Sequence, residues 1–281
     1  MKNRNAFDVN DLKEFEPDAK VGLIATVSEG ELPHITLITA LQARSTTELI
    51  WGQFSEGMSK RNVRKNPRVG FLIMSLSKEL WRGKAVWKKA LNEGDEYIMF
   101  NKKPMWRYNS YFGLHTVHYM DLVETTGREK LPMGGVVRGA LMTKCAKAGA
   151  SSGEQARILK PFAEDLFNDI GALKFISYIG TDGYPVIIPA IQCQAADSRR
   201  LAFAPTAYRD ELAAIPAGTT VAIFCLSLSM EDVLVRGTFR GFSRHRGVKL
   251  GTVDIDWVYN SMPPKQGQIY PEIEMRPVVN F

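Results

Sequence analysis

Hydroxyl and cationic side chains follow one another closely in the segment 55–66. Ser59, Lys60 and Asn62 stand together there, and further basic residues follow up to Arg68. A phosphate group needs cations and hydrogen-bond donors that converge from a rigid frame, and a helix that begins near residue 55 or 59 adds free backbone N–H groups. Lys60 would neutralise part of the anionic charge. The segment is a candidate phosphate site, and the alternative is a basic, solvent-exposed helix turn.

A second group of residues with chemical potential lies in the block 104–113. Arg107 and Asn109 stand there among four aromatic side chains, and the block ends at a glycine. A guanidinium stacked on aromatic rings could cover a ring-shaped ligand or hold an acidic substrate. The alternative is a loop that packs against the rest of the chain through its aromatic residues.

Metal and nucleophile chemistry have little support in the sequence. His115 and His118 lie in a strand-like stretch, where an offset of three places side chains on opposite faces, so we expect no metal site. His34 follows a strand-opening proline and reads as a surface polar residue. The cysteines are odd in number and widely spaced, which is typical of buried thiols in a reducing compartment. They are Cys145, Cys193 and Cys225.

An internal repeat determines how these segments are positioned. Residues recur at an offset of 152, and the offset grows by two after the third predicted turn. Chance would hardly keep such pairs in register. The pairs include Pro33 with Pro185, Gln42 with Gln194, the run 75–77 with 227–229, and 80–83 with 234–237.

Each copy predicts short strands, turns and one interrupting helical segment. Such a pattern indicates a small β-barrel, so the predicted fold is mainly β with two tandem split barrels and short helices that form an intrachain pseudo-dimer. The predicted strands of copy one are 21–27, 33–43, 49–54, 68–75 and 80–89, and those of copy two are 175–179, 185–195, 200–204, 220–227 and 233–242. The predicted domains are 1–130, a helical linker 131–171, and 172–281.

Within the linker, Ser152 and Gln155 have capping-box spacing, and Pro161 could open a second helix that ends at Gly171. The Gly- and Ala-rich stretch 133–149 resembles a linker more than a nucleotide-binding loop, because its glycines do not follow the GxGxxG pattern after a strand.

The composition is that of an ordinary globular protein. The 281 residues are 45% hydrophobic and 23% charged, with a net charge of +6, and no apolar run approaches the length of a membrane span. The first residues lack the apolar core of a secretion signal, so the expected location is the cytoplasm. Nucleic acid is a weak expectation, because no aromatic residues are interleaved with the basic cluster.

Taken in order, these segments resemble the pyridoxamine 5′-phosphate oxidase-like family, the FMN-binding split barrels. The resemblance is carried by the hairpin 25–34, the strand 49–53, and the segment 59–69 with its Asn-Pro-Arg ending. It covers residues 20–90 and, through the repeat, 172–243 more weakly.

The resemblance implies that FMN binds with its phosphate near the helical segment and its ring against the second and third strands. By position, Ser59, Lys60 and Asn62 would face the phosphate. The residues that would border the ring or the ribityl chain are Thr36, Leu37, Ile38, Thr39, Trp51, Gln53 and Phe54, and Arg107 and Asn109 are added from the aromatic block. In copy two, Glu211, Leu212 and Ala214 replace the phosphate-facing residues, so we expect that site to be lost.

The expected function is an FMN-dependent oxidoreductase or electron carrier that acts on a small-molecule substrate or redox partner. One alternative keeps the fold and uses a deazaflavin. Another is a non-enzymatic module that binds flavin or haem, since relatives with this barrel bind haem and a histidine could serve as ligand. Family members usually form homodimers, and the tandem chain could form a homodimer in addition to its internal pair of barrels.

Overall fold

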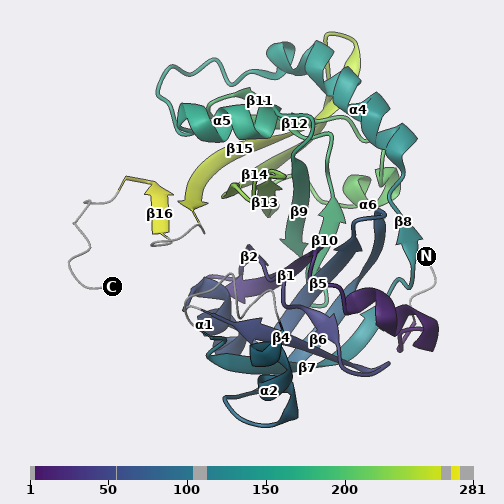
Figure 1. The fold of residues 1–281 in the computed structure, drawn as a ribbon. Helices are drawn as coiled ribbons and strands as arrows, with labels where there is room; N and C mark the ends of the chain where they lie inside the picture. The colour runs from purple at the N-terminus through teal and green to yellow at the C-terminus, as the bar shows by residue number, and fades with distance from the viewer. Residues whose placement is uncertain (1–3, 55, 104–112, 261–266, 273–281) are drawn as a thin grey trace. The chain divides into compact units, whose positions relative to one another are not determined.

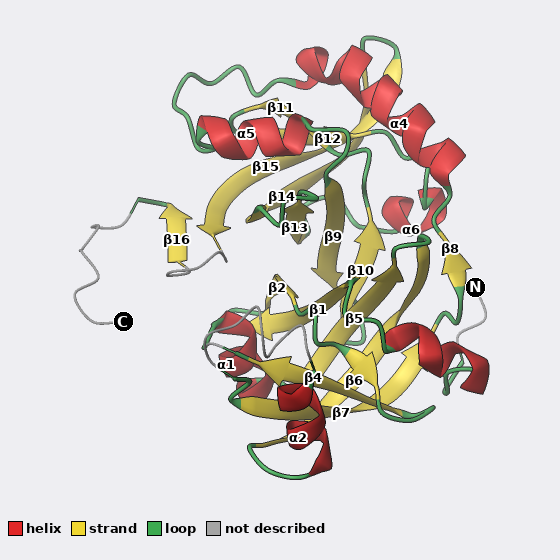
Figure 2. Cartoon of the chain, viewed as in Figure 1, coloured by secondary structure: helices red, strands yellow, loops and turns green. Residues whose placement is uncertain are grey.

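The computed structural model describes residues 4–54, 56–103, 113–260 and 267–272. The chain divides into two compact units, shown in Figures 1 and 2. The first comprises Met1–Pro132 with the hairpin tip Ser177–Ile187, and the second comprises Met133–Ile176 with Ile188–Phe281.

The first unit is built on an eight-stranded sheet whose neighbouring strands pair in antiparallel fashion. Its strand order is β2-β1-β5-β6-β7-β4-β3, and β8 pairs with β6. The strands are β1 (Lys20–Ser28), β2 (Leu32–Leu37), β3 (Gln42–Ala43), β4 (Glu48–Gln53), β5 (Arg68–Ser75), β6 (Glu79–Leu91), β7 (Thr116–Thr125) and β8 (Glu129–Lys130).

Short helices fill the connections of this sheet. The 3₁₀ helix η1 (Val9–Phe15) precedes β1, α1 (Met58–Lys65) joins β4 to β5, and α2 (Asp95–Lys102) follows β6. Pro67 ends α1, because the residue before a proline is driven out of the helical region. The helix α1 packs against β1 and β2.

A hydrophobic core holds the first unit together. Trp51, Phe71 and Trp81 are fully buried in it, and Phe15 of η1 packs edge-on against Trp81 with ring centroids 4.9 Å apart. The indole N–H of Trp81 donates to Asp11 at 2.8 Å, so η1 is tied to the sheet by a buried polar contact as well.

The second unit is built on a sheet of the same strand order, β10-β9-β13-β14-β15-β12-β11, with β16 paired to β15. Three aromatic rings, Phe203, Phe239 and Phe242, pack against one another, and the first two are fully buried in its core. The strands are β9 (Leu173–Ile179), β10 (Pro185–Pro189), β11 (Gln194–Asp197), β12 (Arg200–Phe203), β13 (Thr220–Leu226), β14 (Asp232–His245), β15 (Val248–Asn260) and β16 (Gly267–Tyr270).

Helices of the second unit lie to one side of its strands in Figure 2. They are α4 (Met133–Ala146), the 3₁₀ helix η2 (Lys147–Ala150) and α5 (Pro161–Asn168), while the short α6 (Arg209–Ala213) joins β12 to β13. Both α4 and α5 pack against β11.

The predicted fold class, a mainly β chain with two tandem units of split-barrel type, is confirmed. The pairing of the units into a pseudo-dimer stays a prediction, as do the domain limits and the repeat itself. None of the helices in the described part of the chain is both long and apolar enough to cross a membrane.

Two kinds of local prediction are wrong, the uninterrupted extended segments and the helix start at Ser152. The extended segments 33–43 and 185–195 are each interrupted by a turn, where the Leu41 N–H donates to Ile38 and the Cys193 N–H donates to Ala190. The stretch 133–149, which lies within the predicted helical linker, is largely the helix α4. No helix begins at Ser152: its N–H and hydroxyl instead donate to the carboxylate of Asp197, which holds the segment as a loop.

Candidate functional site

The first turn of α1 leaves its backbone donors available. Gly57 occupies the N-cap position with an extended backbone, and no side-chain oxygen among the described residues caps the helix. The first N–H groups of a helix have no partner within the helix. They point from the end of the helix that carries partial positive charge.

Ser59 and Thr36 are brought together at this helix end. Their hydroxyl oxygens lie 2.5 Å apart, and Ser59 is only 1% exposed. Ser59 comes from α1 and Thr36 from β2, so two elements predicted to border a ligand do meet. One hydroxyl of the pair donates to the other, so one hydroxyl proton remains that can be donated to an acceptor placed beside the pair.

Lys60 is a buried cation at the same end of α1. It is 8% exposed, and no described residue offers its ammonium an ion pair or a hydrogen bond. Burial lowers the pKa of Lys60, and the nearby charge of Glu56 offsets part of that effect. A buried charge without a partner is costly, so this position favours the approach of an anion.

Asn62 has a different environment from Ser59 and Lys60. Its side-chain amide donates to the Thr26 hydroxyl at 3.0 Å, and both residues are buried. The contact fixes the inner face of α1 on β1. A role for Asn62 at a phosphate stays a prediction.

A chain of hydrogen bonds leads from Trp87 through His118 and Gln53 to Glu56, which precedes α1 in the sequence. The Trp87 indole N–H donates to Nδ1 of His118 at 3.0 Å, His118 Nε2 lies 2.7 Å from Gln53 Oε1, and the Gln53 amide donates to Glu56 at 2.8 Å. An indole nitrogen can only donate, so Nδ1 must accept and Nε2 must carry the proton. The neutral imidazole therefore orients the amide of Gln53.

The pKa of His118 agrees with this tautomer. Burial, together with the positive charges of Lys60 and Arg64, lowers it to about 3. The ring also stacks on Trp51, with centroids 3.7 Å apart and planes 5° from parallel. His118 is thus a neutral, fixed element of the site across the physiological pH range.

The other residues predicted to contact the ligand differ in their environments. Trp51 and Ile38 belong to the hydrophobic core, while Phe54 packs against a second cluster that contains Leu114. Leu37 and Thr39 are partly exposed. Contact of these residues with a ligand stays a prediction, and Arg107 and Asn109 lie outside the described residues.

His34 is not a surface residue, contrary to expectation. It is 1% exposed, and it lies on β2 opposite Thr26 of β1 in the antiparallel register. Among the described residues, no group of three or more His, Cys, Asp or Glu side chains converges as a metal site would require. Burial raises the pKa of Cys193 and of Cys225 to about 12, so both remain thiols, whereas Cys145 is exposed, contrary to expectation.

The sequence missed the network of His118, Trp87 and Glu56. The signal that could have found it is cross-strand pairing: Trp51 stands opposite His118 in the β4–β7 register, and Gln53 lies two residues further along β4. That register cannot be read from the spacing of His115 and His118 alone.

The second unit has no comparable anion site at α6. Tyr208 occupies the N-cap in the left-handed region with φ 52°, and Asp210 and Glu211 place acidic side chains in the first turn. Leu212 is fully buried. Acidic groups at a helix start compete with an anionic ligand, so the two units differ in electrostatic character.

Comparison with known proteins reveals only distant similarity. No family model matches the sequence, and no curated protein is detectably similar to it. Several solved structures resemble part of the chain. An FMN-binding protein from Syntrophomonas wolfei is 17% identical, covering 44% of this chain and 89% of its own, with a TM-score of 0.38.

Two further structures show the same pattern. A candidate pyridoxamine 5′-phosphate oxidase from Lactobacillus delbrueckii is 16% identical over 44% of this chain and 98% of its own, with a TM-score of 0.34. An F420 reductase is 14% identical over 42% and 94%, with a TM-score of 0.33. Each spans less than half of this chain, and similarity at this level assigns no cofactor to it.

Proposed function

We propose that this chain is an FMN-binding protein of the pyridoxamine 5′-phosphate oxidase-like type, with the phosphate held at the first turn of α1. The observation that carries the proposal is Lys60, a buried ammonium that forms no ion pair or hydrogen bond with a described residue, beside an uncapped helix start. The choice of a flavin comes from the sequence resemblance.

The residues at this site fit a phosphate group. The donors converge from one helix and one strand: the backbone N–H groups of the first turn, the free proton of the Ser59–Thr36 hydroxyl pair, and the Lys60 ammonium. Burial removes water from the Lys60 ammonium. A phosphate dianion would compensate for that loss with a direct charge interaction. It would also restore the pKa of Lys60 toward its usual value.

The chain's own residues would hold and shield the cofactor. FMN supplies hydride or electron transfer when it is bound, and the protein contributes position and electrostatics. The neutral His118 keeps Gln53 and Glu56 fixed beside the helix start. No described side chain of this network needs to exchange a proton for that role.

The proposed activity is that of an oxidoreductase or electron carrier with a small-molecule substrate or redox partner. A reduced nicotinamide added to the flavin-loaded protein separates this from storage or sensing, since a carrier's flavin would be reduced and a storage protein's would stay oxidised. The absorption spectrum of the purified protein separates FMN from a deazaflavin and from haem.

Replacement of Lys60 tests the phosphate assignment. We expect Lys60→Ala to weaken FMN binding roughly ten- to a hundredfold, because loss of a charge-assisted hydrogen bond costs about 1.5–3 kcal/mol. Titration of the apoprotein with FMN, followed by flavin fluorescence, measures the change.

Two controls accompany this variant. Lys65 lies on the same helix but is 65% exposed and paired to Glu29, so Lys65→Ala should leave the affinity within about twofold. Leu212→Ala in the second unit should leave the flavin content unchanged. Equal affinities of Lys60→Ala and the unaltered chain would reject the phosphate assignment.

A further inference from the structure

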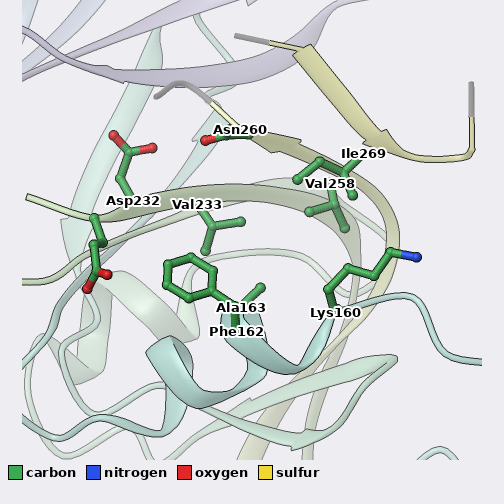
Figure 3. Close-up of a pocket in the computed structure, with 9 residues that line it drawn as sticks. Lys160, Phe162, Ala163, Asp232, Val233, Val258, Asn260 and Ile269 are labelled. Atoms are coloured by element: carbon green, nitrogen blue, oxygen red, sulfur yellow. The ribbon is translucent and has the colours of Figure 1, made fainter. Parts of the chain in front are cut away.

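The second unit contains a cavity that lies outside the candidate flavin site. It has a volume of about 270 Å³ and lies between the start of α5, the start of β14, the end of β15 and β16 (Figure 3). The lining residues are Lys160, Phe162, Ala163, Glu231, Asp232, Val233, Val258, Asn260 and Ile269.

The middle of the cavity is apolar. Phe162 and Ala163 come from α5, Val233 from β14, Val258 from β15 and Ile269 from β16. Phe162 is 54% exposed even though its ring borders this hollow. An apolar ligand segment would bury surface that α5 leaves open, and burial of such surface is the main source of affinity in small-molecule sites.

Opposite charges stand at the two ends of this apolar stretch. Figure 3 shows Asp232 on one side and Lys160 on the other, with Val233 and Ala163 between them. Glu231 adds a second carboxylate next to Asp232, and no described cation lies within ion-pair distance of it; its side chain accepts a hydrogen bond from Ser227 at 3.3 Å.

The Lys160 end is open to an anionic group. Its ammonium lies 3.5 Å from Glu272, but the side chains are 63% and 80% exposed, and such surface pairs contribute little. Lys160 is also the N-cap of α5, which carries no side-chain cap, so the helix start adds positive potential at the same end.

We propose that this cavity binds a small elongated zwitterion whose ammonium and carboxylate are separated by an unbranched apolar chain. The ammonium would lie at Glu231 and Asp232, the carboxylate at Lys160, and the spacer over Phe162 and Val233. This ligand class matches the cavity in charge at both ends and in polarity between them.

Isomeric probes separate this proposal from a general affinity for amphiphiles. 6-Aminohexanoate and norleucine have the same atoms, but only the former carries its charges at opposite ends. We expect saturable shifts in heteronuclear NMR spectra of the full chain around α5 and residues 231–233, with 6-aminohexanoate binding about tenfold more tightly than norleucine. Hexylamine should also bind more weakly, because it lacks the carboxylate.

Variants test which residues carry the binding. Lys160→Gln and Glu231→Gln should each weaken 6-aminohexanoate binding several-fold, and Ala163→Leu should block it by filling the apolar middle. Glu164→Gln, on the same helix but paired to Arg157 outside the cavity, is the matched control and should bind normally. Equal binding of the two isomers, no saturable shift, or unchanged binding by Glu231→Gln would each overturn the proposal.

Discussion

His118 illustrates how a single side chain can be fixed by its neighbours. Trp87 can only donate to it, so the ring accepts at Nδ1 and carries its proton at Nε2 toward Gln53. Protonation of Nδ1 would break the contact with Trp87 and place a second cation near Lys60. His118 is therefore hard to protonate in the folded chain. Its protonation at low pH would destabilise the fold.

That resistance to protonation makes stability depend on pH. The pKa of His118 is about 3 in the folded chain against 6.5 for an ordinary histidine, so the unfolded chain takes up the proton first as the pH falls. Stability due to this group is complete above about pH 6.5 and is lost progressively toward pH 3. We expect the free energy of unfolding to fall by roughly 2 kcal/mol more between pH 7 and pH 5 than it would without this group.

Urea unfolding at the two pH values measures this effect. His118→Gln keeps a polar side chain but cannot titrate, so its stability should depend less on pH, although its absolute stability is lower. His245→Gln is the control, since His245 lies in the second unit and is partly exposed. The same pH dependence in His118→Gln and the unaltered chain would contradict the assignment.

Residue types predicted only part of this site. Ser59 and Lys60 could be chosen from the sequence because hydroxyl and ammonium groups at a helix start have a direct affinity for phosphate. The interaction of Trp51 with His118 depends on which strands are neighbours and in which register, and β4 and β7 are separated by more than sixty residues of sequence. No local pattern contains that information.

The sequence predicts element boundaries that prolines set, but it does not predict the close packing on which α4 depends. Pro33 and Pro185 mark strand starts, and Pro67 marks the end of α1, because proline restricts the backbone locally. The helix α4 lies within the predicted helical linker 131–171, although its glycines disfavour a helix in isolation. Its stability comes from close packing that the glycines permit.

Two glycines of α4 distinguish packing from propensity. A Cβ atom on Gly139 would lie 2.2 Å from the Thr206 hydroxyl oxygen and 3.0 Å from the Gln192 side chain, whereas one on Gly134 would meet nothing within 4 Å. We expect Gly139→Ala to destabilise the chain by roughly 1–3 kcal/mol. Gly134→Ala should be neutral or stabilise by up to about 1 kcal/mol.

Thermal unfolding followed by circular dichroism compares the two variants. They make the same chemical change in one helix, so the helix propensity gained is similar and the difference reports the contact with Thr206. If Gly139→Ala melted at or above the temperature of Gly134→Ala, α4 would not depend on this close approach.

At the scale of the whole molecule, the two units share a strand order but differ in the charge that the equivalent helix carries in its first turn. Helices α1 and α6 occupy the same place along the chain, because each joins the fourth strand of its unit to the fifth. In α1 the first turn carries Ser59 and Lys60. In α6 it carries Asp210 and Glu211, followed by the buried Leu212. One topology thus presents a cationic helix start in one unit and an acidic one in the other.

This asymmetry predicts one FMN per chain. A phosphate dianion at α1 would gain charge-assisted hydrogen bonds, while at α6 the carboxylates of Asp210 and Glu211 would repel it and Leu212 would offer no donor. Flavin absorbance of the saturated protein, divided by the chain concentration from amino-acid analysis, should give a ratio near one. Lys60→Ala should lower that ratio at limiting FMN, whereas Glu211→Gln should leave it unchanged. A ratio of two, or a ratio that responds to Glu211→Gln and not to Lys60→Ala, would place flavin binding elsewhere in the chain.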